Sequence, residues 1–467
     1  MKWMLYISFF ISFISNGQGD VDFLFEELPE DSLISEFRNH SSLKPAIRLS
    51  KFKKNNIHAS ILGDVNYLQT NRVQYKVGLG GMLEYSGDNK WYFRAAATQG
   101  INNFDSTFAP KSFIFQEKSN NSLYTDIRSR ASYTPNHIFN FQIGVDHNFI
   151  GEGSRSLFLS DYGTSYPFGL IRANFWRFEY SVLYQFFREK DQNRWEGKFA
   201  SSHHVSFNAT EWLNIGIFES VIFQPKDTNL IRGFDLEYLN PFVFYRPQEY
   251  SLGSSDNVLL GIELSADWKQ HTFYTQFILD EFYLEELRAK SGWWANKFGG
   301  QFGIKGRFQK GDHKFFYRGE YNFMRPYTFS HISEELNYGN QGTSLAHPYG
   351  ANFMEGLIEF KWSHKKWGGK LFANYYLRGL DKDGDSYGGN IYQPYINRPF
   401  EYGHKIGQGV QLNGVNAIST FSFQIMPSNR LNVFIENHFR FDTQNINSDY
   451  LLVLGIRSML WNDYRNY

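Results

Sequence analysis

Hydrophobic and polar residues alternate with a period of two along most of this chain. In residues 57–68, for example, Ile57 and Ile61 alternate with His58 and Ser60. Successive side chains of a β-strand point to opposite faces, so this alternation predicts strands with one apolar and one polar face. A helical period of 3.6 residues does not fit these runs. A wall that separates lipid from water requires such two-faced strands.

The alternating segments number about 18, and most have about ten residues or more, which is the length that a tilted transmembrane strand needs. They span residues 57–68, 73–86, 90–101, 122–134, 137–149, 168–175, 177–187, 198–209, 213–224, 258–268, 271–282, 298–308, 313–325, 352–364, 367–379, 415–426, 430–442 and 450–461. An even number of antiparallel strands can close without leaving a strand edge in lipid. We therefore predict an all-β fold, a closed antiparallel transmembrane β-barrel of about 18 strands.

The connections between these segments are alternately short and long. Turn-forming residues make up most of the short links, such as residues 87–89 and 427–429. The long connections cover residues 102–121, 150–167, 225–257, 283–297, 326–351 and 380–414. Outer-membrane barrels have short turns at the periplasmic end and long loops at the cell surface. We therefore expect the long connections to be extracellular loops.

Tryptophan positions give an independent test of this orientation. Of the 11 tryptophans, Trp3 lies in the N-terminal leader, and seven of the remaining ten lie beside short links or near the C-terminus. These seven are Trp91, Trp176, Trp212, Trp268, Trp362, Trp367 and Trp461. Tryptophan favours the membrane–water interface, so we expect them to form a girdle at the periplasmic end. The other three, Trp195, Trp293 and Trp294, fall in connecting segments.

The N-terminus has the features of a signal peptide. Lys2 is followed by an apolar run of 12 residues, from Trp3 to Ile14, and then by small or polar residues up to Gly19. This run is shorter than the ~20 residues that a spanning helix needs, so we assign residues 1–19 to a cleaved signal peptide. No later run of about 18 apolar residues occurs, which argues against a helical membrane protein.

Residues 20–50 do not alternate, and they begin with an acidic stretch. Its acidic residues are Asp20, Asp22, Glu26, Glu27, Glu30, Asp31 and Glu36. We expect a short periplasmic or plug-like extension, and a disordered leader is the alternative because like charges repel one another. Residues 51–467 then form one barrel domain. The chain has no cysteine, so neither a lipid-modified cysteine nor a disulfide framework is expected.

Composition agrees with a barrel and excludes one class of partner. Aromatic residues, which favour strands and membrane interfaces, make up 19% of the chain. The 47 basic residues balance 47 acidic ones, which gives no electrostatic reason for nucleic-acid binding. We expect a monomer in the outer membrane, with membrane lipid and a ligand at the cell surface as its partners and without a cofactor.

One segment matches a nucleophile motif. Residues 384–388 read Gly-Asp-Ser-Tyr-Gly, the G-x-S-x-G pattern that places a catalytic serine on a turn between a strand and a helix. The match lies in a polar loop that lacks this setting. We therefore expect no catalytic role for Ser386, and we do not expect an enzyme.

The same loop places Asp381, Asp383 and Asp385 at the spacing of calcium ligands. However, Ser386 stands where the calcium loop needs glycine, and Tyr392 stands where it needs a bidentate glutamate. This incomplete ligand set favours a solvated turn over a calcium site.

Other polar residues fit the interior of a barrel. His203 and His204 are neighbours on one strand and face opposite sides, so one metal ion cannot readily bind both. Charges on the polar face recur two residues apart with opposite sign, as in Asp126 and Arg128. Such groups either pair and fill the lumen or only solvate it. Glu219 breaks the pattern, because it falls on the apolar side of its strand.

The long loops hold the candidate ligand-binding residues, because rigid scaffolds commonly present binding groups on loops. The candidates are Trp293, Trp294, Tyr245, Arg246, Glu249, Arg325, Tyr327, His331 and His347. Aromatic faces beside polar groups suit sugar rings, which stack through their C–H surfaces and hydrogen-bond through their hydroxyls. The alternative is packing between loops that only caps the barrel.

Four segments resemble a known family. They are Gly144–Asp161 (GVDHNFIGEGSRSLFLSD), Arg246–Asn257 (RPQEYSLGSSDN), Gly292–Phe298 (GWWANKF) and Leu345–Asn352 (LAHPYGAN). They resemble the RemB-type gliding-motility proteins of Bacteroidota, which are in turn similar to the capsule-assembly protein Wzi. The resemblance covers most of the mature chain. It implies an 18-stranded, non-enzymatic outer-membrane barrel that acts with surface polysaccharide or in gliding and adhesion.

Three functions are open at this point. The first is a barrel whose extracellular loops bind or organise surface polysaccharide, in capsule assembly and attachment or in gliding motility and adhesion. The second is a diffusion porin, which needs an open, water-filled lumen. The third is an outer-membrane hydrolase with Ser386 as its nominal nucleophile. The chain is too short for a TonB-type transporter, whose roughly 22 strands enclose a separate plug.

Overall fold

The computed structural model describes most of the predicted barrel domain. The described residues are 43–44, 56–69, 73–87, 90–103, 114–117, 122–191, 194–227, 230–231, 233, 236–239, 256–426, 431–444 and 449–458. The predicted signal peptide, nearly all of the predicted extension 20–50, and Trp461 lie outside these residues.

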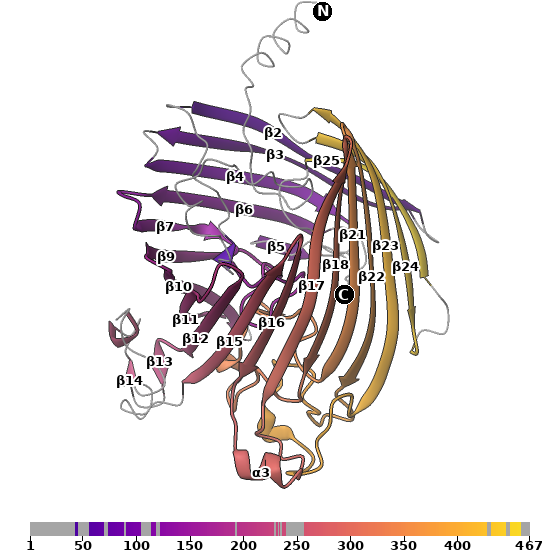
Figure 1. Cartoon of the computed structure of the whole chain (residues 1–467). Helices are drawn as coiled ribbons and strands as arrows, with labels where there is room; N and C mark the ends of the chain where they lie inside the picture. Colours follow the sequence, from indigo (N-terminus) through magenta and orange to yellow (C-terminus); the bar gives the residue numbers. More distant parts are fainter. Residues whose placement is uncertain are drawn as a thin grey trace, which may run out of the picture.

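Eighteen antiparallel strands form a closed barrel (Figure 1). They are β2 (Asn56–Gln69), β3 (Val73–Gly87), β4 (Trp91–Asn102), β6 (Ser122–Tyr133), β7 (Phe139–Asp146), β9 (Tyr166–Phe175), β10 (Phe178–Asp191), β11 (Arg194–Asn208), β12 (Leu213–Phe223), β15 (Asn257–Trp268), β16 (His271–Leu279), β17 (Phe298–Lys310), β18 (His313–Met324), β21 (Phe353–His364), β22 (Trp367–Leu380), β23 (Val410–Met426), β24 (Leu431–Asp442) and β25 (Asp449–Ser458). Each strand pairs with the next, and β25 pairs back with β2, where Asp64 lies opposite Arg457. The closed barrel predicted from alternation is confirmed.

Each predicted segment corresponds to one strand of the barrel, and the differences lie at the strand ends. β7 ends at Asp146, before the predicted end at residue 149, because the chain leaves the wall there and enters the lumen. β23 begins earlier than predicted, at Val410. Trp195 belongs to β11 and not to a connecting segment, so that expectation is wrong.

The outer wall is apolar. Ile57, Ile61 and Leu79 are 71%, 71% and 68% exposed on the outside, whereas Ser60 and Leu62, on either side of Ile61, face inward and are buried. In a soluble protein such a continuous exposed apolar surface would be unstable, but in a membrane it faces lipid. The closed ring and this exterior make the protein an outer-membrane β-barrel.

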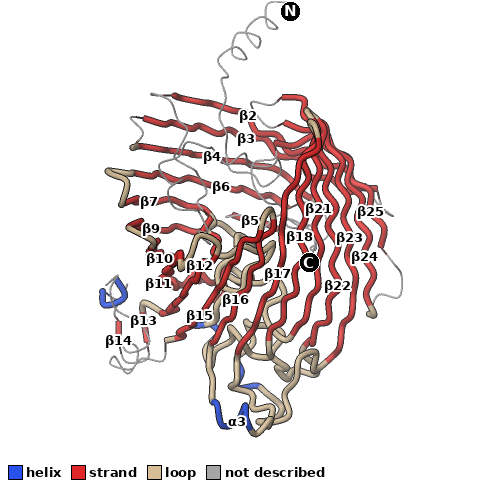
Figure 2. The backbone as a smooth tube through the Cα atoms, viewed as in Figure 1, coloured by secondary structure: helices blue, strands red, loops and turns tan. Residues whose placement is uncertain are grey.

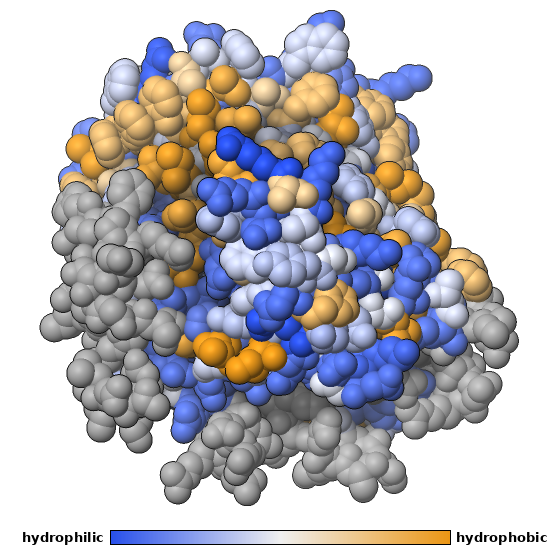
Figure 3. Space-filling view, turned by 90° about the horizontal axis from the view of Figure 1, so that it is seen from below, coloured by the Kyte–Doolittle hydropathy of each residue, from blue (hydrophilic) through white to orange (hydrophobic). Residues whose placement is uncertain are grey.

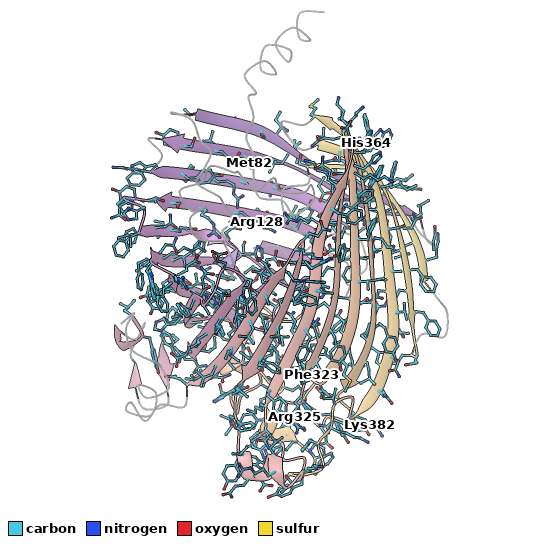
Figure 4. The ribbon with its side chains drawn as sticks, in the orientation of Figure 1. Met82, Arg128, Phe323, Arg325, His364 and Lys382 are labelled. Atoms are coloured by element: carbon cyan, nitrogen blue, oxygen red, sulfur yellow. The ribbon has the colours of Figure 1, made fainter. Side chains whose placement is uncertain are left out.

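The two ends of the barrel differ. Short turns lie at the end of the strands that carries His364, and long loops lie at the end that carries Arg325 and Lys382 (Figure 4). Five predicted girdle tryptophans, namely Trp91, Trp176, Trp212, Trp268 and Trp367, are between 42% and 66% exposed and lie beside the short turns. Trp362 is partly buried and donates a hydrogen bond from Nε1 to His313 Nδ1. This girdle identifies the short-turn end as periplasmic.

One short strand, β5 (Ile114–Glu117), pairs with β6 within the barrel sheet. The other short elements lie outside the ring of strands. They are β1 (Leu43–Lys44), β8 (Phe149–Ile150), β13 (Lys226–Asp227), β14 (Leu230–Ile231), β19 (Gly339–Asn340), β20 (Thr343–Ser344), α3 (Leu284–Arg288) and the 3-10 helices η4 (Leu236–Leu239), η5 (Glu334–Leu336) and η6 (Tyr395–Asn397). β1 pairs with β8, where Leu43 lies opposite Ile150. Among the described residues, no helix has both the length and the apolar character needed to cross a membrane.

Two long connections fold into the barrel. Residues 147–165, between β7 and β9, and residues 336–352, before β21, lie largely buried between the walls (Figure 2). We name these two segments the plug. The expectation that residues 150–167 and 326–351 are extracellular loops is therefore wrong for these parts. The physical reason is their content of large apolar residues, which gain free energy by leaving water.

One hydrophobic cluster runs through the plug from wall to wall. The ring of Phe158 in the plug stacks on Phe218 of β12, with their centroids 4.8 Å apart. The ring centroid of Tyr349 in the plug lies 5.1 Å from that of Tyr376 on β22. The cluster also includes Phe168 on β9, which is on the opposite side of the ring of strands from β22. The plug thus fills the lumen at this level.

Buried polar contacts hold the plug in one position. Arg155 Nη2 lies 3.4 Å from Glu355 Oε1 on β21, and His347 Nε2 lies 2.8 Å from Glu355 Oε2. Glu320 Oε2 on β18 accepts a hydrogen bond of 2.7 Å from the backbone N–H of Ser154. Removing one partner of such a buried pair costs about 3–5 kcal/mol, so the contacts specify where the plug sits.

Charged residues on the inner wall pair with one another, which agrees with the first of the two predicted alternatives. Arg128 Nε lies 3.1 Å from Asp126 Oδ2 on the same strand. Arg318 pairs with Glu359 across the strands, with 3.0 Å between Nη1 and Oε2. Glu320, two residues from Arg318, is engaged by the plug.

His203 and His204 of β11 face opposite sides of the wall, as predicted. His204 Nε2 lies 2.9 Å from Glu263 Oε1 inside the barrel. His203 faces outward, and its Nδ1 lies 4.0 Å from Glu219 Oε2. Glu219, which breaks the alternation, is buried on the outer wall in the region where Tyr238 of η4 packs against the strands.

We expect Phe158→Ala to destabilise the protein by about 3–5 kcal/mol, because it leaves a cavity at the centre of the plug. Urea unfolding of the protein in lipid vesicles, followed by near-UV circular dichroism, measures this change. Phe93→Ala is the control, because Phe93 is 38% exposed on the outer wall of β4. An equal loss in both variants would contradict the central role of the plug.

Candidate functional site

Three connections meet at the extracellular end of the barrel. Residues 280–297 follow β16 and include α3, residues 325–335 follow β18, and residues 381–409 follow β22 and include η6. Figure 1 places α3 beyond the ends of the strands, and Figure 4 places Arg325 and Lys382 at the same end. We name the surface formed by these three segments the loop cluster.

Backbone hydrogen bonds join the first and third segments. The N–H of Trp294 donates to Glu401 O at 3.1 Å, and the N–H of His404 donates to Gly292 O at 2.8 Å. Gly292 has a φ of 67°, and a Cβ atom there would lie 2.8 Å from His404 N. The left-handed backbone and the close approach both require glycine at this position. The pairing holds the two tryptophans that follow Gly292 against the third segment.

Trp294 is the centre of an aromatic and cationic group. Its ring centroid lies 4.6 Å from that of Tyr395 and 6.3 Å from that of Tyr327. The guanidinium carbon of Arg398 lies 4.1 Å from the Trp294 centroid, and Lys297 Nζ lies 4.1 Å from the Tyr395 centroid. The negative face of each ring attracts the cation above it. Residues from all three segments therefore form one unit.

Two titratable groups on the buried side of this unit, those of His331 and Tyr395, have shifted pKa values. Burial, together with the nearby cation of Lys297, lowers the pKa of His331 to about 4. Burial and the neighbouring Glu281 raise the pKa of Tyr395 to about 12. At neutral pH both side chains are therefore neutral. The cations beside them pair with carboxylates: Lys297 Nζ lies 3.0 Å from Glu281 Oε1, and Arg398 Nη2 lies 2.6 Å from Glu401 Oε1.

Aromatic rings at the rim of the unit remain exposed. Tyr283, Phe400 and Tyr402 are 46%, 40% and 54% exposed, and the Trp293 ring packs edge-on against Tyr283. Figure 3, which views the molecule from below, shows hydrophobic groups set within a mostly hydrophilic surface. Sequence reasoning missed these rim residues. The signal was present in residues 395–402, which mix three aromatic residues with an arginine and a glutamate.

The structure brings together five of the nine predicted ligand-binding residues. These are Trp293, Trp294, Arg325, Tyr327 and His331. Arg325 Nη2 donates to Trp293 O at 3.3 Å, which places this arginine among the residues that support the cluster. His347 instead lies inside the plug on Glu355. Tyr245, Arg246 and Glu249 lie outside the described residues.

The calcium hypothesis has no converging set of ligands. Asp381 Oδ1 accepts a hydrogen bond of 2.6 Å from the backbone N–H of Tyr387, and Lys382 Nζ lies 3.8 Å from Asp383 Oδ2. Asp383 itself sits in a tight turn with a φ of 56°. In the part of the chain that the structure describes, no three histidine or carboxylate side chains gather at a possible metal site.

Ser386, the nominal nucleophile, is fully buried. Its Oγ makes no hydrogen bond to any described residue. A nucleophilic serine needs a base within hydrogen-bond reach, and this serine has none among them.

Comparison with known proteins supports the fold. No protein-family model and no curated protein matches the chain. Among solved structures, the chain is similar to Wzi of Escherichia coli, an outer-membrane protein involved in group 1 capsule assembly and a carbohydrate-binding β-barrel. The TM-score is 0.57 at 14% sequence identity, and the alignment covers 85% of this chain and 83% of Wzi. The chain is also similar to OprD of Pseudomonas aeruginosa, with a TM-score of 0.45, 8% identity, and coverage of 88% and 97%.

We expect acid to weaken the loop cluster through His331. The pKa of His331 is about 4 in the folded protein and about 6.5 when unfolded, so its neutral form contributes stability above pH 6.5 that is lost as the pH falls toward 4. Between pH 7.5 and 4.5, His331→Gln should lose about 2 kcal/mol less stability than the wild-type protein. Urea unfolding at both pH values measures the difference.

The control for this prediction is His137→Gln, on an exposed turn after β6. It should lose as much stability on acidification as the wild-type protein. If His331→Gln and His137→Gln both lose as much stability on acidification as the wild-type protein, protonation of His331 is not the cause of the loss.

Proposed function

We propose that this outer-membrane barrel binds surface polysaccharide through the loop cluster and so organises or attaches that polysaccharide at the cell surface. The observation that carries the proposal is the exposed rim of Phe400 and Tyr402 in the loop cluster, together with Arg398, which lies over the Trp294 ring and pairs with Glu401. Aromatic rings stack on the C–H faces of sugars, while charged groups bind hydroxyl and carboxyl groups.

The plug supports a function at the outer surface. A lumen that is filled with hydrophobic side chains offers little room for a solute, so ligand contacts are favoured at the exposed ends. The loops at the extracellular end are also joined to one another, which lowers the entropy cost of ordering them around a ligand.

The comparison with Wzi supports the polysaccharide part of the proposal by analogy of fold. The four sequence segments that resemble RemB-type proteins support a role in gliding motility and adhesion. The two roles share a glycan-binding surface and differ in what the bound glycan does. A deletion strain separates them: loss of cell-bound capsule favours assembly or attachment, and loss of surface spreading favours gliding.

The alternative function is a diffusion porin. It needs a continuous aqueous path, whereas residues 147–165 and 336–352 occupy the lumen between opposite walls. Single-channel recording of the purified protein in planar bilayers decides between the two: steady conductance at low voltage favours the porin, and its absence favours the plugged, glycan-binding barrel.

We expect Tyr402→Ala to weaken binding of the purified surface polysaccharide by up to about tenfold, because it removes an exposed stacking face worth up to about 1.5 kcal/mol. Trp294→Ala should weaken binding at least as much, because it removes the ring against which Tyr395 and Arg398 pack. Biolayer interferometry on the full chain in detergent measures the affinity. Trp176→Ala, in the periplasmic girdle, is the matched control and should bind normally. Equal affinity in all variants would place glycan binding elsewhere.

A further inference from the structure

Lysines gather on three consecutive periplasmic turns, which we name the lysine turns. They are residues 269–270 between β15 and β16, residues 310–312 at the end of β17 and before β18, and residues 365–366 between β21 and β22. These six strands follow one another in the ring. Neighbouring strands lie about 4.8 Å apart, so adjacent turns lie about 10 Å apart. The long side chains of lysines on two turns can therefore reach one group between them.

The lysine turns carry little negative charge. Their basic residues, Lys269, Lys310, Lys365 and Lys366, are all exposed. Asp312 is the single acidic residue in the sequence of these turns. Its Oδ2 lies 4.0 Å from Lys365 Nζ, and the two side chains are 71% and 69% exposed. Ion pairs this exposed contribute little, because water and salt screen them.

Three consecutive turns elsewhere on the ring differ in charge. They join β6 to β7, β9 to β10 and β11 to β12, and they cover residues 134–138, 176–177 and 209–212. Arg177 is their one arginine, Glu211 is their one acidic residue, and they contain no lysine. The basic character of the lysine turns is therefore not shared by this second part of the periplasmic rim.

Aromatic and imidazole rings link the lysine turns along the outer wall. The hydroxyl group of Tyr317 on β18 hydrogen-bonds with Nδ1 of His271 on β16. His313 and His364 lie opposite one another on β18 and β21, with their ring centroids 4.1 Å apart. His364 shares the outward face of β21 with Phe360, which is 40% exposed, and Figure 4 places His364 at the short-turn end. These contacts connect all three turns.

The contact of Trp362 with His313 determines which nitrogen of the histidine carries hydrogen. Trp362 Nε1 donates a hydrogen bond of 3.0 Å to His313 Nδ1. An indole nitrogen can only donate, so Nδ1 is the bare nitrogen of the imidazole and Nε2 carries the hydrogen. His313 thus offers a donor next to the lysine turns, as an acceptor such as a phosphate oxygen requires. A metal ion would need a bare Nε2 and would compete with the bond from Trp362.

The lysine turns lie at the depth of the lipid headgroups. Trp268 and Trp367, which flank two of the turns, are 59% and 42% exposed on the outer wall. Lys269 Nζ lies 4.9 Å from the centroid of the Trp268 ring. Tryptophan favours the level of the headgroups, so a cation beside it is close to the lipid phosphates. Cations next to lipid-facing rings suit a molecule with both an acyl part and an anionic head.

We propose that the lysine turns bind an anionic phospholipid of the periplasmic leaflet. The lysine ammonium groups and the Nε2–H of His313 bind the phosphate oxygens, and the rings of Trp268 and Trp367 contact the glycerol and acyl part. Basic residues near a membrane surface attract anionic lipids in preference to lipids without net charge. The inference is independent of the glycan-binding proposal, because the two surfaces lie at opposite ends of the barrel.

Native mass spectrometry of the full chain in an uncharged detergent tests the proposal. The protein is titrated with dioleoylphosphatidylglycerol, which is anionic, or with dioleoylphosphatidylethanolamine, which has no net charge. We expect at least tenfold tighter binding of the anionic lipid. The combined variant Lys269→Gln, Lys310→Gln, Lys365→Gln and Lys366→Gln should lose at least tenfold in affinity for phosphatidylglycerol and should bind the two lipids alike.

The matched control removes the same amount of charge at the extracellular end. It combines Arg288→Gln, Lys290→Gln, Lys382→Gln and Lys405→Gln, four exposed residues of the loop cluster. This variant should bind phosphatidylglycerol as tightly as the wild-type protein. Folding of each variant in detergent is verified by its heat-dependent mobility on gels.

Three results would overturn the proposal. The first is equal binding of both lipids by the wild-type protein, and the second is an equal loss of phosphatidylglycerol binding in both combined variants. The third is displacement of phosphatidylglycerol from the wild-type protein by an equal concentration of glycerol phosphate, because it would identify the ligand as a soluble phosphate ester. Retention of the lipid in this competition supports a membrane lipid as the occupant.

Discussion

Lipid offers no hydrogen-bond partner to a backbone amide, so every strand in the hydrocarbon region needs a neighbour on both sides. The pairing of β25 with β2 meets this requirement for the whole chain, because it turns an open sheet into a ring. The outward apolar residues and the inward polar residues follow from the same closure. A break at the Asp64 and Arg457 pair would expose two strand edges to lipid at once.

A ring of eighteen strands encloses more space than inward side chains alone can fill. In this barrel the plug fills that space. The backbone N–H groups of the plug therefore lie in a low-dielectric interior, where each needs a hydrogen-bond acceptor. Glu320 supplies one for Ser154, and Glu355 compensates the charge of Arg155. The carboxylates on the wall therefore stabilise the plug, and the apolar cluster between them adds the larger favourable term.

The plug determines where ligand chemistry can occur. With the middle of the lumen occupied, the exposed aromatic rings of the loop cluster face the cell surface. The loop cluster pairs its cations with rings such as Trp294 and Tyr395.

The sequence by itself determined the number of strands, their approximate ends and the face on which each residue lies. A period of two is a local property that lipid on one side and water on the other impose on every strand. The same local signal placed the tryptophan girdle and the periplasmic turns, and it separated His203 from His204.

Only the tertiary structure decided which long connections turn inward, because a segment between strands has no period that reveals its destination. His347 and Trp294 looked alike in the sequence, as polar and aromatic residues of long connections. Contacts with Glu355 bury the first, and contacts with Tyr395 and Arg398 hold the second at the surface. Tyr395 and Arg398 are distant from Trp294 along the chain, and no motif marks Glu355 as the partner of His347, so the local sequence reveals neither contact.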